Sequence, residues 1–199
     1  MTTEPIILAS GSASRAKMLR DAGVPIIVEK PRVDEEAVKL SLRAEGVPPR
    51  AQVDALAEVK ALSVSRMRPG LVIGADQMLA IGNDVLDKSA SREEARAHLR
   101  LLSGKTHELL NAAVVARDGV AIWRHISTPK LRMRALSDAF IESYLDQVGD
   151  DAFTSVGAYK LEGLGGQLFE DVSGDFFAVL GLPLLPLLAF LRAQGTLPT

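Results

Sequence analysis

The sequence contains no cysteine among its 199 residues. This absence excludes disulfide bonds, cysteine-ligated zinc or iron–sulfur sites, and thiol catalysis. The N-terminal segment also lacks a basic stretch followed by the longer apolar run of a secretory signal. Both absences fit a protein that stays in a reducing compartment, and the sequence therefore predicts a cytoplasmic location.

An excess of positive charge is absent too, because 23 basic residues face 25 acidic ones and the net charge is −2. A nucleic-acid polymer is therefore not expected as a partner, although a local basic cluster could still hold a small anion. The sequence has no Walker-type loop, dinucleotide-binding fingerprint or nucleophile elbow. His98, His107 and His125 are scattered without metal-ligand spacing, so structural or surface roles are expected for them.

The chain lacks a convincing membrane span. Its most apolar stretch, residues 176–191, is marginal in length and carries Pro183 and Pro186, which favours a buried C-terminal helix. With 47% hydrophobic residues, the chain is long enough to bury a sizeable core. A single domain is expected, with a soft division into two lobes near residues 100–105.

Strand and helix patterns alternate along the chain. Strands are expected at 6–9, 24–28, 71–81, 85–86, 106–116, 120–127, 131–135, 168–172 and 176–180. Helices are expected at 12–22, 50–66, 91–104, 137–148 and 183–192. We expect a break at residues 74–76 in the third strand, a turn at residues 82–83 and a hairpin between the last two strands. This order predicts an α/β or α+β fold with a mixed sheet and flanking helices.

The first candidate site lies where the first strand meets the first helix. Ser10 and Ser12 offer hydroxyls beside the free N–H groups of a helix N-terminus, and Arg15 adds a guanidinium. Such a terminus favours anions, and arginine binds phosphate through two parallel hydrogen bonds. A plain serine cap is the alternative interpretation.

Three further positions place charge in unusual surroundings. Lys60 falls on the apolar stripe of the helix at 50–66, so it must reach solvent, pair with an acid or meet an anionic ligand. Asp76 lies in an apolar strand, either as a functional carboxylate or as the turn residue where the strand ends. The acidic run at residues 34–36 could supply a second carboxylate for a magnesium ion or simply begin a solvated helix.

Taken together and in order, these segments resemble the Maf family. The segments that carry the resemblance are ILASGS at 7–12 with Arg15, VDE at 33–35, LA at 56–57, KA at 60–61, VIGADQ at 72–77, Leu86 and Lys88, LSGKTH at 102–107, GAY at 157–159, Glu162-Gly163 and GLPL at 181–184. The resemblance covers nearly the whole chain.

The resemblance implies a hydrolase that converts a nucleoside triphosphate to the monophosphate and pyrophosphate. It implies a divalent metal, magnesium or manganese, a cleft between two lobes similar to that of inosine triphosphate pyrophosphatases, and a homodimer. The family's proton acceptor falls on Asp76 and its other metal-side acid on Glu35. Its phosphate-side groups fall on Ser10, Ser12, Arg15, Lys60 and Lys88. An ordinary aspartate is a weak base toward water, so metal ligand and general base both stay open for Asp76.

Departures from the family pattern bear on the substrate. Ser14 stands where an arginine is usual, and Asn111 where a threonine is usual. Gln77 and Glu162 resemble the family's 7-methyl-GTP subgroup rather than its dTTP/UTP subgroup, although that subgroup usually has a tryptophan at the position of Ser14. These specificity positions favour a guanine-type substrate.

Two other functions are weighed against the hydrolase. The lost arginine at position 14 allows a non-enzymatic nucleotide-binding regulator of cell division, as the family's historical name implies. The apolar C-terminal helix allows a structural protein that binds a partner through that helix.

Overall fold

The computed structural model describes residues 4–82 and 84–198. The chain folds into two compact units of strands and helices. Unit 1 comprises Met1–Asp76, Asn111–Ser127 and Gly181–Thr199, and unit 2 comprises Gln77–Leu110 and Thr128–Leu180. Residues 100–105, where a soft division was expected, lie inside unit 2. The chain passes between units four times, after Asp76, Leu110, Ser127 and Leu180. The first two passages lie within the long strands at residues 71–81 and 106–117, where no turn or linker marks a boundary.

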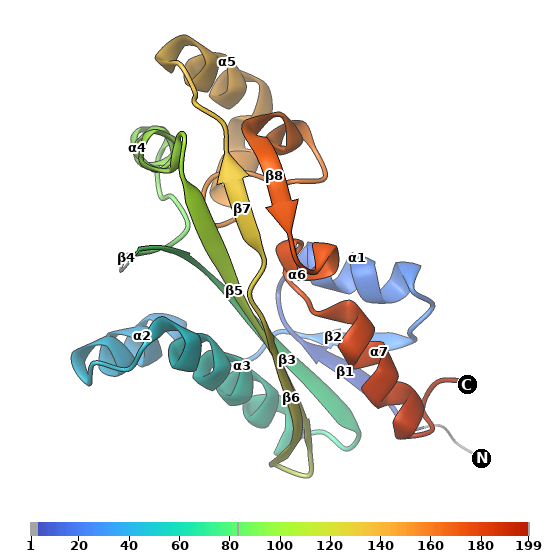
Figure 1. Cartoon of the computed structure of the whole chain (residues 1–199). Coiled ribbons are helices and arrows are strands. Elements are labelled where there is room, and N and C mark those ends of the chain that lie inside the picture. Colours follow the sequence, from blue (N-terminus) through green and yellow to red (C-terminus); the bar gives the residue numbers. More distant parts are fainter. Residues whose placement is uncertain (1–3, 83, 199) are drawn as a thin grey trace. The chain divides into compact units, whose positions relative to one another are not determined.

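Unit 1 combines three parallel strands with an antiparallel pair (Figure 1). β1 (Ile6–Ala9) pairs in parallel with β2 (Ile26–Glu29) and with the first part of β3 (Leu71–Ile81). The second part of β5 (Thr106–Arg117) pairs antiparallel with β6 (Val120–Ser127). The helices of this unit are α1 (Ala13–Asp21), α2 (Glu35–Ala44), α3 (Pro49–Ser65) and α7 (Leu184–Ala193).

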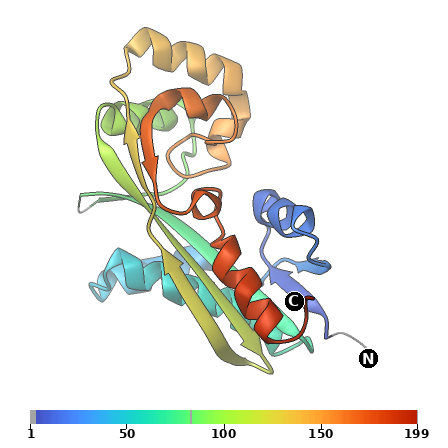
Figure 2. The ribbon, with the colours of Figure 1, turned by 45° about the vertical axis from the view of Figure 1, so that its right-hand side comes forward.

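Helices α3 and α7 lie on opposite faces of β6. Arg124 forms ion pairs with Asp54 and Glu58 of α3, whereas the ring of Trp123 stacks on Phe190 of α7. Adjacent strand residues point to opposite faces, so these contacts assign one helix to each face. Figure 2 shows α7 on the near side of the unit 1 strands.

Unit 2 has an antiparallel arrangement around its own apolar core. β7 (Lys130–Met133) pairs with the start of β5 and with β8 (Phe169–Ser173), and β4 (Asp84–Leu86) pairs with the end of β3. Its helical segments are α4 (Arg92–Leu102), α5 (Asp138–Val148), α6 (Phe176–Val179) and the 3-10 turns Gly149–Phe153 and Leu164–Leu168. Buried residues from β5, β7, α4 and α5 make up the core.

The strand order is β2-β1-β3-β5-β7-β8, with β4 on β3 and β6 on β5. This mixed sheet of eight strands with accompanying helices confirms the predicted α/β fold class. No helix within residues 4–82 and 84–198 is both long and apolar enough to cross a membrane. The expected inter-lobe cleft stays a prediction.

Two of the predicted elements differ from those observed. β3 runs through Gly74 and Asp76 without the expected break. The expected strand at 176–180 is helix α6, which begins because Asp175 accepts a hydrogen bond from the Phe177 N–H. An apolar run this short is compatible with either structure, and the cap decides for the helix. Of the predicted 82–83 turn, residue 83 lies outside the described residues.

His107 has the structural role expected of it. Its Nε2 and the Tyr159 hydroxyl share a hydrogen bond of 2.6 Å, and the side chain is buried. Burial lowers the pKa of His107 from 6.5 to about 4. Below pH 6.5 His107 binds a proton in the unfolded chain but stays neutral in the folded chain. The free energy of unfolding therefore falls as the pH drops toward about 4.

This linkage predicts a measurable slope. Between these two pH values His107 should remove up to about 1.4 kcal/mol of stability per pH unit. We expect His107→Gln to flatten the acid side of the curve of unfolding free energy against pH, measured by denaturant titration, and His125→Gln to leave it unchanged. An acid-side slope in His107→Gln as steep as that of wild type would contradict the assignment.

Candidate active site

The loop between β1 and α1 is organised by its two serines. The Ser12 hydroxyl accepts a hydrogen bond from the Arg15 N–H at 3.3 Å, and the Ser12 N–H donates to the Ser10 hydroxyl at 3.1 Å. The serine-cap interpretation is therefore correct for Ser12. It does not exclude a ligand, because the helix N-terminus is a positive pole and has no acidic residue in its first turn. Ser14 lies half-buried in that same turn.

Arg15 is fixed by main-chain carbonyls rather than by carboxylates. Its Nε donates to the Gly181 carbonyl at 2.7 Å, and its Nη1 donates to the Ala75 carbonyl at 3.0 Å. A longer contact of 3.4 Å joins Nη1 to the Ser10 hydroxyl. Burial lowers the pKa of Arg15, against the attraction of Asp76 and Glu35 that raises it. A guanidinium stays protonated in proteins, so Arg15 contributes an oriented positive charge beside the peptide that precedes Asp76.

Lys60 forms the centre of a charged group in unit 1. Its stripe neighbours on α3 are buried, and Lys60 itself is only 5% exposed. Its Nζ lies 2.7 Å from Asp76 Oδ1 and 2.7 Å from Glu35 Oε2. The structure therefore shows that this lysine pairs with acids instead of reaching solvent, which compensates the burial of its charge. The anionic ligand stays a prediction.

The two carboxylates reach Lys60 from different elements. Asp76 is a buried residue within β3, so the interpretation as a turn residue at a strand end is wrong. Glu35 follows the N-cap Asp34 in the first turn of α2, where it is half-buried, while Asp34 and Glu36 are exposed. The acidic run is thus a solvated helix start with one member turned toward Lys60.

The spacing of α3 and β3 depends on Gly74. A Cβ atom built there would lie 2.2 Å from the Ala57 carbonyl oxygen and 2.6 Å from the Ala61 nitrogen. Both atoms belong to the backbone of α3 on either side of Lys60, so glycine allows the helix and strand to approach closely. This close approach brings Lys60 within reach of Asp76.

The other three predicted residues belong to unit 2. The exposed Lys88 follows β4, and its backbone forms an isolated bridge with Val156. Glu162 is exposed in the turn before the second 3-10 segment. Gln77 donates from Nε2 to the carbonyls of Ala178 and Val179, at 3.0 and 3.1 Å. These two contacts fix the orientation of its amide, because the flipped form would set oxygen against oxygen.

Sequence reasoning missed the acceptors that orient Arg15 and Gln77. They are main-chain carbonyls at Ala75, Gly181, Ala178 and Val179, and no side-chain pattern marks a carbonyl as an anchor. The one sequence signal that could have pointed to an acceptor was that Gly181 begins the GLPL segment, which is part of the family resemblance.

The donor set of unit 1 fits a hard divalent cation. Asp76 and Glu35 direct carboxylate oxygens at one point, which Lys60 Nζ occupies. Magnesium in nucleotide enzymes typically uses one or two carboxylates together with water and phosphate oxygens. Within residues 4–82 and 84–198 no three His, Asp or Glu side chains are grouped to hold a metal alone. The pair therefore suits a metal whose coordination a substrate completes.

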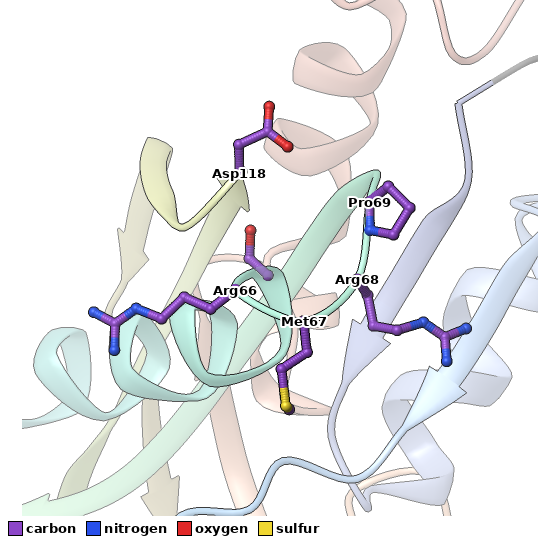
Figure 3. Close-up of a pocket in the computed structure, with 6 residues that line it drawn as sticks. Arg66, Met67, Arg68, Pro69 and Asp118 are labelled. Carbon is purple, nitrogen blue, oxygen red and sulfur yellow. The ribbon is translucent and has the colours of Figure 1, made fainter.

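A cavity of about 410 Å³ lies elsewhere in unit 1, where α3 ends and the β5–β6 turn begins (Figure 3). Arg66 and Arg68 line it, but Figure 3 shows their side chains pointing in different directions, and Arg68 pairs with Glu29. The C-terminus of a helix also disfavours anions. This cavity therefore lacks the convergent positive charge that a phosphate requires.

Comparison with known proteins confirms the resemblance. The model of the family described as Maf-like protein matches residues 5–194. The chain belongs to the Maf family. A relative from Hyphomonas neptunium, named nucleoside triphosphate pyrophosphatase, is 53% identical over 194 residues, with 98% of each chain covered. One from Paramagnetospirillum magneticum with the same name is 54% identical, covering 96% of this chain and 99% of that protein. One from Mesorhizobium japonicum, named 7-methyl-GTP pyrophosphatase, is 50% identical, with 98% of each covered.

Proposed function

We propose that this Maf protein is a nucleoside triphosphate pyrophosphatase, which hydrolyses the bond between the α and β phosphates and releases pyrophosphate. The observation that carries the proposal is the group formed by the buried Lys60 and Asp76 with the half-buried Glu35, beside which Arg15 is held. This group combines oriented positive charge with two oxygen ligands, which are the requirements of phosphoryl-group chemistry. The names of full-length relatives agree with this reaction.

The polar and the positively charged residues have different roles in binding the phosphates. Ser10, Ser12 and the N-terminus of α1 bind phosphate oxygens, and Arg15 neutralises them. Lys60 adds a point charge for the polyphosphate, and the family resemblance assigns the same role to Lys88. Water attacks the α-phosphorus, and the bond from that atom to the leaving pyrophosphate breaks. A base accepts the proton that the water loses. Asp76 serves either as that base or as a metal ligand.

A divalent cation is part of the proposal. Asp76 and Glu35 would hold magnesium or manganese, which would neutralise phosphate charge and make bound water more acidic. Removal of divalent ions with EDTA should accordingly stop pyrophosphate release.

A guanine-type base is the proposed specificity. Gln77 uses its amide hydrogens on two carbonyls, which leaves its oxygen as an acceptor, and the Glu162 carboxylate is an acceptor as well. A guanine base offers N–H donors on its edge, and 7-methylguanine adds a positive charge that a carboxylate favours. The relative named 7-methyl-GTP pyrophosphatase supports this choice. Ser14 cannot stack on the base.

Glu162→Gln tests this specificity. The substitution keeps the shape but removes the negative charge, so kcat/KM for 7-methyl-GTP should fall about tenfold relative to GTP. Kinetics on 7-methyl-GTP, GTP, dTTP and UTP would measure the change. Glu170→Gln is the matched control, since Glu170 is an exposed carboxylate of β8 paired with Arg132. An unchanged substrate ratio would remove Glu162 from the specificity set.

A nucleotide panel tests the reaction itself. Purified protein with magnesium should release pyrophosphate from at least one nucleoside triphosphate, with the monophosphate formed in equal amount. Tight nucleotide binding without any turnover would instead favour the regulator of cell division that Ser14 suggests. If the protein neither binds nor hydrolyses any nucleotide, the remaining alternative is a structural protein that binds a partner through its C-terminal helix.

The proposal includes a cytoplasmic homodimer. Fractionation of cells that produce the tagged protein would test the location. Light scattering on the purified protein would test the dimer, and a monomer mass at all concentrations would contradict it.

A further inference from the structure

The position of Lys60 has a consequence for metal binding. Its ammonium donates to Asp76 and pairs with Glu35, both at 2.7 Å, and its side chain is 6% exposed. The two carboxylates proposed to hold the metal therefore already share a cation that belongs to the protein itself.

An ammonium and a divalent ion cannot occupy this point together. Magnesium binds carboxylate oxygens at about 2.0–2.1 Å, and two cations that share the same ligands would repel each other strongly. Metal binding therefore requires Lys60 to leave at least one carboxylate. Leaving both would strand a buried charge, which is costly without a new partner.

Within residues 4–82 and 84–198, no third acidic or histidine side chain joins Asp76 and Glu35 in a group that could hold a metal. A polyphosphate would offer one kind of new partner, because its oxygens accept hydrogen bonds from an ammonium. A metal that arrives together with the polyphosphate thus compensates Lys60, whereas a metal that arrives alone does not.

We infer that Lys60 acts as an internal substitute for the metal, so that the carboxylate pair binds a divalent cation tightly only when a nucleotide is present. The inference rests on the proposed function for its choice of polyphosphate as the ligand. It makes Lys60 a determinant of the order of binding in addition to its role as a phosphate-side charge.

Manganese titration without nucleotide tests the inference, with free Mn²⁺ measured by electron paramagnetic resonance. Wild type should bind Mn²⁺ weakly, and Lys60→Met should bind it at least about tenfold more tightly. Lys60→Arg keeps the charge and should bind as weakly as wild type. Lys17→Met, which removes an exposed lysine paired with Asp21, is the control.

Two further measurements secure the interpretation. Adding a non-hydrolysable triphosphate analogue should tighten Mn²⁺ binding to wild type by at least about tenfold and should affect Lys60→Met much less. Thermal unfolding should show a larger Mn²⁺-induced rise in Tm for Lys60→Met than for wild type. The gain should disappear in Lys60→Met combined with Asp76→Asn, and a gain that persists there would place the metal elsewhere.

The inference fails if folded Lys60→Met and wild type bind Mn²⁺ equally tightly in the absence of the analogue. Its failure is separable from that of the proposed function. Pyrophosphate release by wild type with equal Mn²⁺ affinities overturns only the substitute role. Absence of turnover on every nucleotide, with tighter Mn²⁺ binding by Lys60→Met, overturns only the reaction.

Discussion

Asp76→Asn is expected to lower the rate of pyrophosphate release by about 10²- to 10⁴-fold, whether Asp76 is a metal ligand or a general base. The amide keeps the size of the carboxylate but has no negative charge to hold a cation or accept a proton. The fold should survive, because the amide oxygen can still accept from Lys60 and Glu35 still supplies a counter-charge. Initial rates at saturating magnesium and nucleotide would measure the effect, with circular dichroism to verify folding.

The matched control is Asp21→Asn. Asp21 is an exposed aspartate of unit 1 that pairs with Lys17 on the surface of α1, a type of pair that contributes little to stability. Its substitution should leave the rate near wild type. If folded Asp76→Asn also retained wild-type turnover, the role assigned to Asp76 would be refuted.

The local features that the sequence predicted correctly are those encoded by near neighbours. The apolar stripe of α3 follows helical spacing, and all of its members, Lys60 included, are buried as that spacing requires. Helices were expected to begin at Ser12, Ser91 and Ser137, and each of these serines caps the helix that follows, because its side-chain oxygen accepts from an N–H three residues on and needs no distant partner.

The features that the sequence left open depend on long-range packing. Whether Lys60 reached solvent, an acid or a ligand depended on where β3 and α2 placed Asp76 and Glu35. The strand proposed at 176–180 failed because the cap at Asp175 outweighed an apolar pattern that suits a strand equally well. Arg15 donates to the carbonyls of Ala75 and Gly181, and Gly181 lies 166 residues after Arg15 in the sequence. No local pattern could reveal such partners.

Gly74→Ala is expected to lower both stability and activity, although it adds only a methyl group. Position 74 does not need the conformational freedom of glycine, since its φ angle lies outside the left-handed region. It needs space, because the new Cβ would meet backbone atoms of α3 at 2.2 and 2.6 Å. Backbone cannot rotate away as a side chain can, so α3 must shift. A cost of about 3 kcal/mol would lower Tm by roughly 6–12 °C.

The shift should also separate the charged pair. Lys60 lies on α3 between the two clashing residues, Ala57 and Ala61, and Asp76 lies two positions after Gly74. Pyrophosphate release by Gly74→Ala should therefore fall at least about tenfold even at temperatures where the variant is folded. Gly163→Ala is the stability control, because its Cβ would meet nothing closer than 3.8 Å. Wild-type Tm and rate in Gly74→Ala would show that the contact between α3 and β3 does not set the geometry of Lys60 and Asp76.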